Sequence, residues 1–213
     1  MIKLVAFDMD GVLTYEKSSW YYVHKRLGLD NSENFKKYTD KKITYDEFFK
    51  LDLNLWINKF NKIKKCEIVS ILKEIKIMEG LPDVIDYLHK NNMKAIIVSG
   101  GISWLSDIIM DKYNFDYAYA NEIFTDEDNN IIPYGKINVV PDKKNIVIKN
   151  AIKKYNINRD NVLSIGDSKT DYSMYTASKY FIAFNSDDDF IKSISDYNID
   201  NDIKKVIDFL ESY

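Results

Sequence analysis

Two acidic side chains, Asp8 and Asp10, stand one residue apart at the end of the apolar run IKLVAF, and Gly11 follows them. One carboxylate and one glycine would be enough to end a buried strand. Two carboxylates this close repel each other, so the pair costs free energy unless a cation or a shared proton relieves it. Side chains two residues apart on a strand point the same way, so we expect both carboxylates to face one pocket. The spacing indicates a chemical role for the pair.

Two later stretches end in a similar way. The run IIVSGG (residues 96–101) finishes in Ser99 and two glycines, and LSIGDSKTD (163–171) places Asp167 and Asp171 after another apolar run. In an open α/β sheet, ligands bind beyond the carboxyl ends of the strands. We therefore expect these side chains to converge with the first acidic pair on one crevice.

The contents of this crevice suggest a reaction. Its four carboxylates would be unstable without a divalent cation, and Mg²⁺ suits oxygen ligands while keeping waters to share with a phosphate. Ser99, with the backbone amides of Gly100 and Gly101 at a helix start, offers uncharged donors to phosphate oxygens. A cation, an anion cradle and a nucleophilic carboxylate together indicate phosphoryl transfer.

The elements that must position these residues alternate along the chain. Short apolar runs typical of strands stand at residues 2–7, 94–99, 116–120, 161–166 and 180–184. Helical patterns lie between most of them and at the end, at 82–91, 102–113, 143–155 and 202–212. A hairpin that turns at residues 128–130 is expected after the third strand. Strands that alternate with helices predict an α/β fold, with a parallel sheet covered on both faces.

Residues 15–78 interrupt this alternation. They contain no convincing strand, only helix-like pieces, and the longest piece carries an apolar stripe at helical spacing, formed by Phe49, Leu53, Trp56 and Phe60. We expect this segment to form a small helical cap domain inserted after the first strand. Residues 1–14 and 79–213 would then form the α/β core.

Composition excludes several classes of protein. A formal net charge of −3 gives no basic surface for nucleic acid. No run of about 18 apolar residues is present, so no membrane span is expected, and the N-terminus shows no signal-peptide pattern. The sequence therefore favours a cytoplasmic protein, and it does not indicate an oligomeric state. Cys66 is the only cysteine, and Arg26 and Arg159 are the only arginines, so bidentate arginine recognition of a carboxylate or phosphate is nearly unavailable.

Four motifs, DMDGVLT, IVSGG, the lysine of PDKK and GDSKTD, resemble the signature motifs of the haloacid dehalogenase (HAD) superfamily in their expected order. The resemblance covers nearly the whole chain. The stretch MEGLPDVIDYLHKNNMKAIIVSGG and the hairpin before PDKK are most similar to the phosphoserine-phosphatase-like subgroup, which carries a helical cap after the first motif. The resemblance implies a Rossmann-like parallel core with that cap inserted after strand 1.

The resemblance also implies a role for each motif. Asp8 would attack phosphorus and form an aspartyl-phosphate. Asp10 would protonate the leaving alcohol and then deprotonate the water that hydrolyses the intermediate. Ser99 and Gly100 would bind the phosphoryl oxygens.

A Mg²⁺ ion is the cofactor that the resemblance implies. It would bind a carboxylate oxygen of Asp8, the backbone carbonyl of Asp10, Asp167 and waters. Asp171 would orient a water or the lysine without touching the ion.

The lysine of PDKK is Lys143 or Lys144. Lys144 is preferred, because apolar Val147 and Ile148 then follow at the three- and four-residue offsets that the family shows. In that place it would neutralise charge beside Asp8.

These features together predict a HAD-type phosphatase, a Mg²⁺-dependent phosphomonoester hydrolase that acts on a small phosphorylated metabolite. Phosphoserine phosphatase proper stays open, and so does a phosphotransferase or mutase with the same intermediate, because the motifs do not separate them. A dehalogenase typically lacks the second acid that Asp10 supplies. A non-catalytic regulator that binds a phosphorylated ligand is disfavoured, since receiver-type domains with a similar acidic pocket are shorter and have no helical insert.

The cap segment bears on the substrate. Tyr45 lies where the family places an aromatic side chain over the substrate, although it could equally anchor the cap helix. The subgroup's arginine for the carboxylate of phosphoserine falls on Asp52 when the chains are aligned from Lys42 and Tyr45, and an acid there would repel that carboxylate. The subgroup's glutamate for the amino group falls on Lys17, with Glu16 one residue out of register. The sequence therefore predicts phosphoserine to be a poor substrate.

Overall fold

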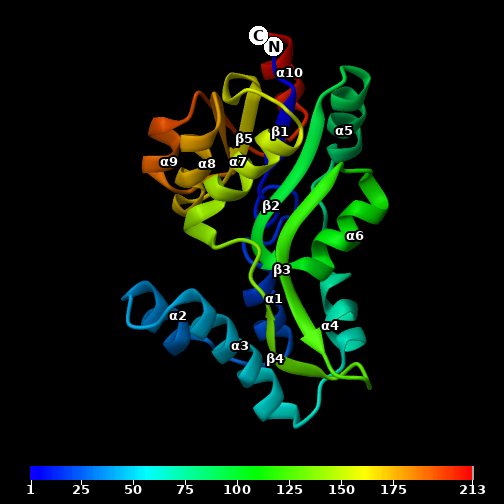
Figure 1. Ribbon diagram of the computed structural model, residues 1–213, viewed down its shortest axis with the longest axis vertical. Coiled ribbons are helices and arrows are strands. Elements are labelled where there is room, and N and C mark those ends of the chain that lie inside the picture. The colour runs from blue at the N-terminus through cyan, green and yellow to red at the C-terminus, as the bar shows by residue number, and fades with distance from the viewer. Residues whose placement is uncertain (213) are drawn as a thin grey trace.

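The computed structural model describes residues 1–212, whose strands form one seven-stranded sheet in the order β4-β3-β2-β1-β5-β6-β7 (Figure 1). The strands are β1 (Leu4–Phe7), β2 (Lys94–Ile102), β3 (Tyr117–Thr125), β4 (Ile131–Lys136), β5 (Val162–Gly166), β6 (Tyr180–Phe184) and β7 (Tyr197–Ile199). Neighbouring strands pair in parallel except β3 and β4, which form an antiparallel hairpin. The α/β fold class with a mostly parallel sheet is confirmed.

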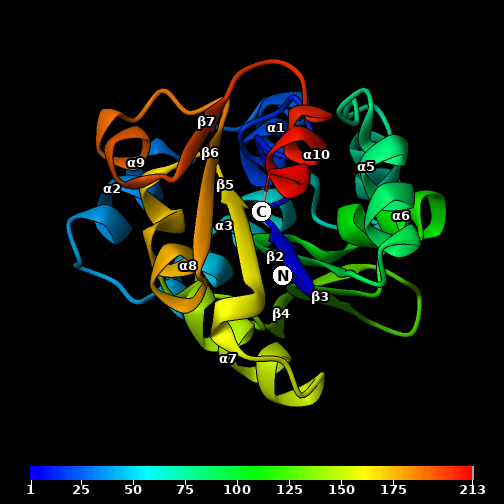
Figure 2. The same ribbon diagram turned by 90° about the horizontal axis from the view of Figure 1, so that it is seen from above.

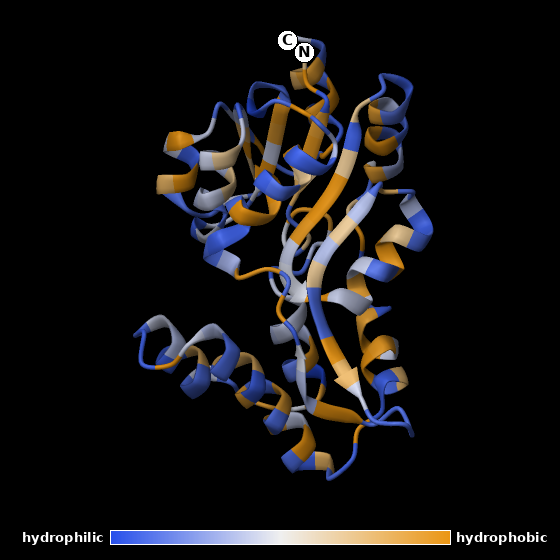
Figure 3. Cartoon of the chain, viewed as in Figure 1, coloured by the Kyte–Doolittle hydropathy of each residue, from blue (hydrophilic) through white to orange (hydrophobic). Residues whose placement is uncertain are grey.

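Helices cover both faces of the sheet (Figure 2). One face packs against α5 (Leu81–Lys90), α6 (Ser103–Tyr113) and α10 (Lys205–Glu211), and the other against α7 (Lys144–Lys154), α8 (Tyr172–Ala177) and α9 (Asp189–Ile194). Alternate side chains of β1 serve the two layers: Val5 and Phe7 belong to the first core, Leu4 and Ala6 to the second. Strands buried on both sides read as continuous apolar runs, and β2 is hydrophobic over most of its length (Figure 3).

The segment between β1 and β2 folds as α1 (Ser19–Arg26), α2 (Ser32–Thr39), α3 (Tyr45–Phe60) and α4 (Lys65–Leu72). The start of α3 is set by a capping box, in which the hydroxyl of Thr44 accepts from the Glu47 amide and the Glu47 carboxylate accepts from the Thr44 amide. Helix α2 was not predicted from the sequence, and the reason is physical, because none of its residues is buried and it lacks a core-facing stripe. The division into a cap at 15–78 and a core at 1–14 and 79–213 stays a prediction.

The β3–β4 hairpin runs away from the rest of the sheet and lies along α3 (Figure 1). Gly135 on β4 is packed so closely that an added Cβ would meet the ring of Phe49 at 2.7 Å. Phe49, Leu53 and Trp56 are buried as the apolar stripe predicted, whereas Phe60, the last residue of α3, is 42% exposed. The hairpin therefore ties the helical segment to the sheet.

Two strands differ from the sequence prediction. Strand β1 stops at Phe7, so Asp8 and Asp10 lie in the turn that follows it rather than on the strand itself. Strand β7 was not predicted, since its three residues are too few to show a period.

Within residues 1–212, no helix has the length and apolar character needed to cross a bilayer.

Candidate active site

The carboxyl ends of β1, β2 and β5 and the first turn of α7 meet at one cavity of about 560 Å³ beneath α1, α2 and α3. The residues that line it are Asp8, Asp10, Lys17, Ser18, Trp20, Tyr21, Asp30, Asn31, Ser32, Phe35, Tyr38, Tyr45, Phe48, Ser99, Gly100, Gly101, Pro141, Lys144, Asp167, Ser168 and Thr170. Most of the side chains predicted to carry chemistry are therefore brought to one place. Strands β2 and β5 lie on opposite sides of β1, so the strand order reverses there, and this is where an open α/β sheet binds its ligands.

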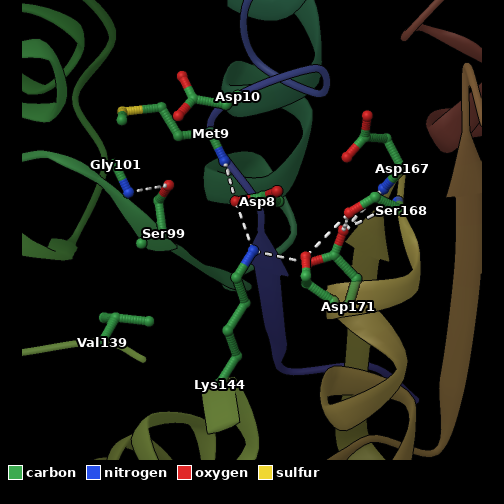
Figure 4. Close-up of polar contacts among 12 residues, drawn as sticks. Asp8, Met9, Asp10, Ser99, Gly101, Val139, Lys144, Asp167, Ser168 and Asp171 are labelled. Atoms are coloured by element: carbon green, nitrogen blue, oxygen red, sulfur yellow. Dashed lines mark hydrogen bonds and ion pairs between the residues drawn. The ribbon is translucent and has the colours of Figure 1, made fainter. Parts of the chain in front are cut away.

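Asp8 is held from two sides (Figure 4). Its Oδ1 accepts the backbone N–H of Met9 at 2.7 Å and lies 2.7 Å from the ammonium of Lys144. Burial raises the pKa of the Asp8 carboxyl, and the Lys144 ammonium opposes that rise. The anionic form of Asp8 therefore depends on the positive charge beside it.

Lys144 begins α7 and is 2% exposed. Its Nζ lies between two carboxylates, 2.7 Å from Asp8 Oδ1 and 2.6 Å from Asp171 Oδ1. Burial alone would lower the pKa of Lys144, but the carboxylates of Asp171 and Asp8 outweigh it and raise the pKa. Lys143 is exposed on the preceding 3₁₀ turn (Pro141–Lys143), so the geometry selects Lys144 from the two lysines of PDKK.

Asp171 is fully engaged by the protein. While Oδ1 accepts from Lys144, Oδ2 accepts the backbone N–H groups of Asp167 at 3.0 Å and Ser168 at 3.1 Å. Gly166 must lack a side chain here, because a Cβ would stand 2.4 Å from the Asp171 Cβ. Asp171 therefore fixes both the lysine and the loop after β5, which fits the positioning role expected of it.

Asp167 pairs with a partly exposed lysine, and its carboxyl has a raised pKa. Its Oδ2 lies 2.9 Å from the Nζ of Lys17, a side chain that is 47% exposed. Burial, with the Asp171 carboxylate next in effect, raises the pKa of Asp167 to about 6. The backbone turn at Gly11 has φ +80°, and a Cβ there would lie 2.3 Å from Asp167 Oδ2. Only a glycine leaves room for this carboxylate.

The acidic residues of this cluster fit a hard divalent cation. Asp8, Asp167 and Asp171 each offer an oxygen, and these atoms lie within 4.8 Å of one another. The donors are all oxygen, as Mg²⁺ prefers, and the charges of Lys144 and Lys17 together balance only two of the three buried carboxylates. Asp8 and Asp167 are the better candidate ligands, since both Asp171 oxygens already accept hydrogen bonds. A ligand role for the Asp10 carbonyl stays a prediction.

Asp10 has one satisfied oxygen and one free one. Oδ2 accepts from the hydroxyl of Ser19 at 2.8 Å, whereas Oδ1 is buried and has no hydrogen-bond partner among the residues that the structure describes. Burial raises the pKa of Asp10 to about 6, although the hydrogen bonds from Ser19 oppose the rise. Gly101 packs against this group, where a Cβ would lie 2.6 Å from Asp10 Oδ2. A buried carboxyl oxygen without a partner is suited to exchange a proton with a bound ligand.

Ser99 and Gly100 differ in what they offer. The hydroxyl oxygen of Ser99, 2% exposed, accepts from the Gly101 amide at 3.0 Å, so its hydrogen remains available to an anion. The carbonyl of Gly100 accepts from the Trp20 indole at 3.2 Å, the Tyr45 hydroxyl at 3.0 Å and the Asn121 amide at 3.0 Å. Gly100 therefore anchors the helical segment to β2, a contact that the sequence did not indicate. The polar Asn121 stands directly after the apolar run at residues 116–120, and this was the available signal.

The residues of the helical segment that were expected to contact the substrate differ in where they lie. Tyr45 lines the cavity, and its hydroxyl both donates to Gly100 and accepts from Asn121, so it is also an anchor. Glu16 is not among the lining residues, and Lys17 stands there instead. The role expected of Glu16 toward the substrate has no support in this geometry.

The structure corrects the expected position of Asp52. This carboxylate is 1% exposed and is not among the lining residues, so it does not face a ligand. The Trp56 indole donates to Nδ1 of His24 at 3.0 Å, which leaves the His24 Nε2 hydrogen to donate to Asp52 at 3.1 Å. Asn31 donates to the same carboxylate at 3.0 Å. Asp52 is buried among donors that an alignment of motifs does not reveal.

Comparisons with known proteins agree with this geometry. The signature of the haloacid dehalogenase-like hydrolase family matches residues 2–178. The chain is 26% identical over 200 residues to phosphoserine phosphatase of Archaeoglobus fulgidus, covering 92% of this chain and 56% of the relative. It is 24% identical over 183 residues to phosphoserine phosphatase of Methanocaldococcus jannaschii, covering 85% of each. Among the curated relatives, the chain spans 56%, 59% and 47% of the enzymes from Archaeoglobus, Saccharomyces cerevisiae and Vibrio cholerae.

Solved structures show the same fold. Phosphoserine phosphatase in apo form superimposes with a TM-score of 0.82 at 21% identity, covering 98% of this chain and 99% of that one. A phospho-aspartyl intermediate analogue of phosphoserine phosphatase gives a TM-score of 0.81 at 20% identity, covering 98% of both chains.

Proposed function

The chain belongs to the haloacid dehalogenase-like hydrolase family, and on that premise we propose that it is a Mg²⁺-dependent phosphomonoester hydrolase that works through an aspartyl-phosphate on Asp8. The observation that carries the proposal is the position of Lys144, whose ammonium is buried between Asp8 and Asp171 at 2.7 and 2.6 Å. Such a contact keeps a buried carboxylate anionic and supplies positive charge where phosphate oxygens would lie.

Asp8 is positioned to act as the nucleophile. The Met9 amide and Lys144 both hold Oδ1, which fixes the plane of the carboxylate. Attack forms a bond from a carboxylate oxygen to phosphorus as the bond from phosphorus to the alcohol oxygen breaks. The Ser99 hydroxyl, with its oxygen held by Gly101, donates to a phosphoryl oxygen in this step.

Asp10 is positioned to move the protons. Its unpartnered Oδ1 gives a proton to the leaving alkoxide, which departs as the alcohol. The same oxygen then takes a proton from the water that attacks phosphorus, and inorganic phosphate and free Asp8 result. Ser19 keeps the other oxygen of Asp10 in place through both steps.

Mg²⁺ would be held by carboxylate oxygens of Asp8 and Asp167 and, by family resemblance, the Asp10 carbonyl, where it would offset the negative charge of the bound phosphate. Lys144 lies between Asp8 and Asp171 beside this site and holds both carboxylates in place. We further propose that residues 15–78 form the cap over this site, with residues 1–14 and 79–213 as the core, because α1, α2 and α3 supply the wall opposite the catalytic loops. Phosphoserine is a second candidate substrate, because the curated relatives are phosphoserine phosphatases.

Phosphate release with Mg²⁺ by the wild type and by Asp8→Asn tests this proposal. We expect the substitution to lower kcat by at least about a thousandfold while circular dichroism stays native, since the nucleophile is lost at nearly constant volume. Asp128→Asn, on the exposed hairpin turn, is the matched control and should keep full activity. A kcat of Asp8→Asn within about tenfold of the wild type, a difference of roughly 1.4 kcal/mol, would rule out the aspartyl-phosphate.

A further inference from the structure

The wall of the cavity opposite the acidic residues is aromatic. Six rings from three helices line it: Trp20 and Tyr21 of α1, Phe35 and Tyr38 of α2, and Tyr45 and Phe48 of α3. Resting on the proposed phosphatase activity, we propose that the alcohol released from the substrate is uncharged and carries an aromatic ring, which packs against this wall. Such a substrate is an arylmethyl or heteroaryl-alkyl phosphomonoester.

The rings are arranged to extend a stack. Tyr38 and Phe48 are parallel, with centroids 5.1 Å apart and planes at 7°. Phe35 lies 6.2 Å from Phe48, and Tyr38 lies 5.5 Å from Tyr45, both tilted. A ligand ring that joins this group gains the offset or edge contacts that aromatic pairs prefer.

Two of the rings that line the cavity are more exposed than the aromatic residues of a hydrophobic core. Phe35 is 54% exposed and Tyr21 is 61% exposed, although both border a cavity rather than an open face. Apolar side chains left open beside a catalytic loop lose contact with water when a ligand covers them. The aromatic residues of α2 are therefore better placed to contact a ligand than to stabilise the fold.

The charges around the cavity disfavour a leaving group that carries a carboxylate. Among residues 1–212, the cations that line the cavity are Lys17 and Lys144, and they already pair with Asp167 and with Asp8 and Asp171. No arginine of this described part lines the cavity, and Arg26 pairs with Glu74 at 2.9 Å. A carboxylate on the leaving group would meet aromatic carbon and the acid Asp30, with no positive charge to bind it.

The size of the cavity points the same way. About 560 Å³ is in the range of pockets that enclose a ligand of drug size. A substrate as small as phosphoserine would leave much of the aromatic wall in contact with water. A ring-bearing alcohol covers that wall while the phosphate reaches Asp8.

The test compares kcat/KM for benzyl phosphate, n-butyl phosphate, phosphoserine and phosphoethanolamine, with Mg²⁺ present. Benzyl phosphate is used instead of phenyl phosphate because phenolate leaves more easily than an alkoxide, which would mimic recognition of the ring. We expect benzyl phosphate to exceed each of the others by at least about fivefold, which lies within the range of about two- to twelvefold for one good aromatic contact.

Variants then assign the preference to the wall. Phe35→Ala should lower the ratio of kcat/KM for benzyl phosphate to kcat/KM for n-butyl phosphate by about fivefold. Phe35→Tyr keeps the ring, so its ratio should equal that of the wild type. Phe48→Leu, which keeps apolar volume but removes a ring, is the second variant. Tyr175→Ala is the matched control, because this ring is 36% exposed on α8 outside the cavity, and the ratio should not change.

The outcomes separate the two proposals. If none of the four esters is hydrolysed, the proposed function is wrong. If esters are hydrolysed but phosphoserine or phosphoethanolamine is preferred, the function stands and the aromatic leaving group is overturned. An unchanged ratio in both Phe35→Ala and Phe48→Leu likewise overturns it.

Discussion

The ammonium of Lys144 lies 2.7 Å from Oδ1 of Asp8, and both side chains are almost completely removed from water. Each charge stabilises the other in a site that is shielded from water. Burial raises the pKa of Asp8, and the nearby cation counters that rise. The geometry joins stability and catalysis in a single contact, so changes to either residue should affect both.

Lys144→Met tests this coupling, because it keeps the length of the side chain and removes its charge. Asp8 and Asp171 then share a buried site with no cation between them, and we expect the free energy of unfolding to fall by roughly 3–5 kcal/mol. Turnover should fall by at least about a hundredfold, since the positive charge beside the phosphate is lost. Thermal unfolding and phosphate release measure the two effects.

Lys143→Met is the control for that experiment. Lys143 is the adjacent residue, and its side chain is exposed on the 3₁₀ turn. We expect near wild-type stability and activity. Equal losses in the two variants would mean that the neighbourhood, rather than the contact with Asp8, is responsible.

Asp10→Asn should separate the two halves of the reaction. With an activated ester such as p-nitrophenyl phosphate, the leaving group needs no proton, so the phosphoryl group still reaches Asp8. Hydrolysis needs a base, so turnover should fall about 10²- to 10⁴-fold and the phosphorylated protein should accumulate. Intact mass after an acid quench should show the gain of one phosphoryl group, and the absence of this species in an impaired variant would argue against a proton-transfer role for Asp10.

Removal of divalent cations should abolish activity, and added Mg²⁺ should restore it. Excess Ca²⁺ should inhibit, because it takes more oxygen ligands in looser geometry and would displace the Asp8 carboxylate. Asp167→Asn should raise the Mg²⁺ concentration at half-maximal binding measured by calorimetry, whereas Asp160→Asn, at an exposed position, should not. Full turnover in excess chelator would contradict the proposal that activity requires Mg²⁺.

Much of the site follows from local sequence. Asp8 and Asp167 directly follow apolar strands, Ser99 lies in the last part of another, and parallel strands place their carboxyl ends at one edge of the sheet. Lys144 could be inferred only by family resemblance, and in the structure its ammonium lies beside Asp8, whereas Lys143 is exposed. These residues are predictable because strand ends fix where their backbones lie.

Residues whose positions depend on side-chain direction were harder to predict. Asn121 joins Gly100, Tyr45 and the loop before α7, yet the sequence shows only a polar residue after the apolar run at 116–120. The register after Gly11 decided that Lys17, and not Glu16, enters the cavity. A positive φ at that glycine turns the chain in a way that no pattern of hydrophobicity records.

Asp52 gives the last prediction, since its role differs from the one expected. The sequence placed it where it would repel a substrate carboxylate, but the structure buries it against His24 and Asn31. Asp52→Asn places an amide group beside the His24 N–H and the Asn31 amide, so we expect the free energy of unfolding to fall by about 1–3 kcal/mol. Asp46→Asn, exposed on the same helix and paired with Lys50, should cost about 0.5 kcal/mol or less. The ratio of kcat/KM for phosphoserine and benzyl phosphate should stay the same in Asp52→Asn, because the side chain does not line the cavity. A rise in this ratio in favour of phosphoserine would mean that Asp52 acts on the substrate carboxylate, and it would contradict a purely structural role.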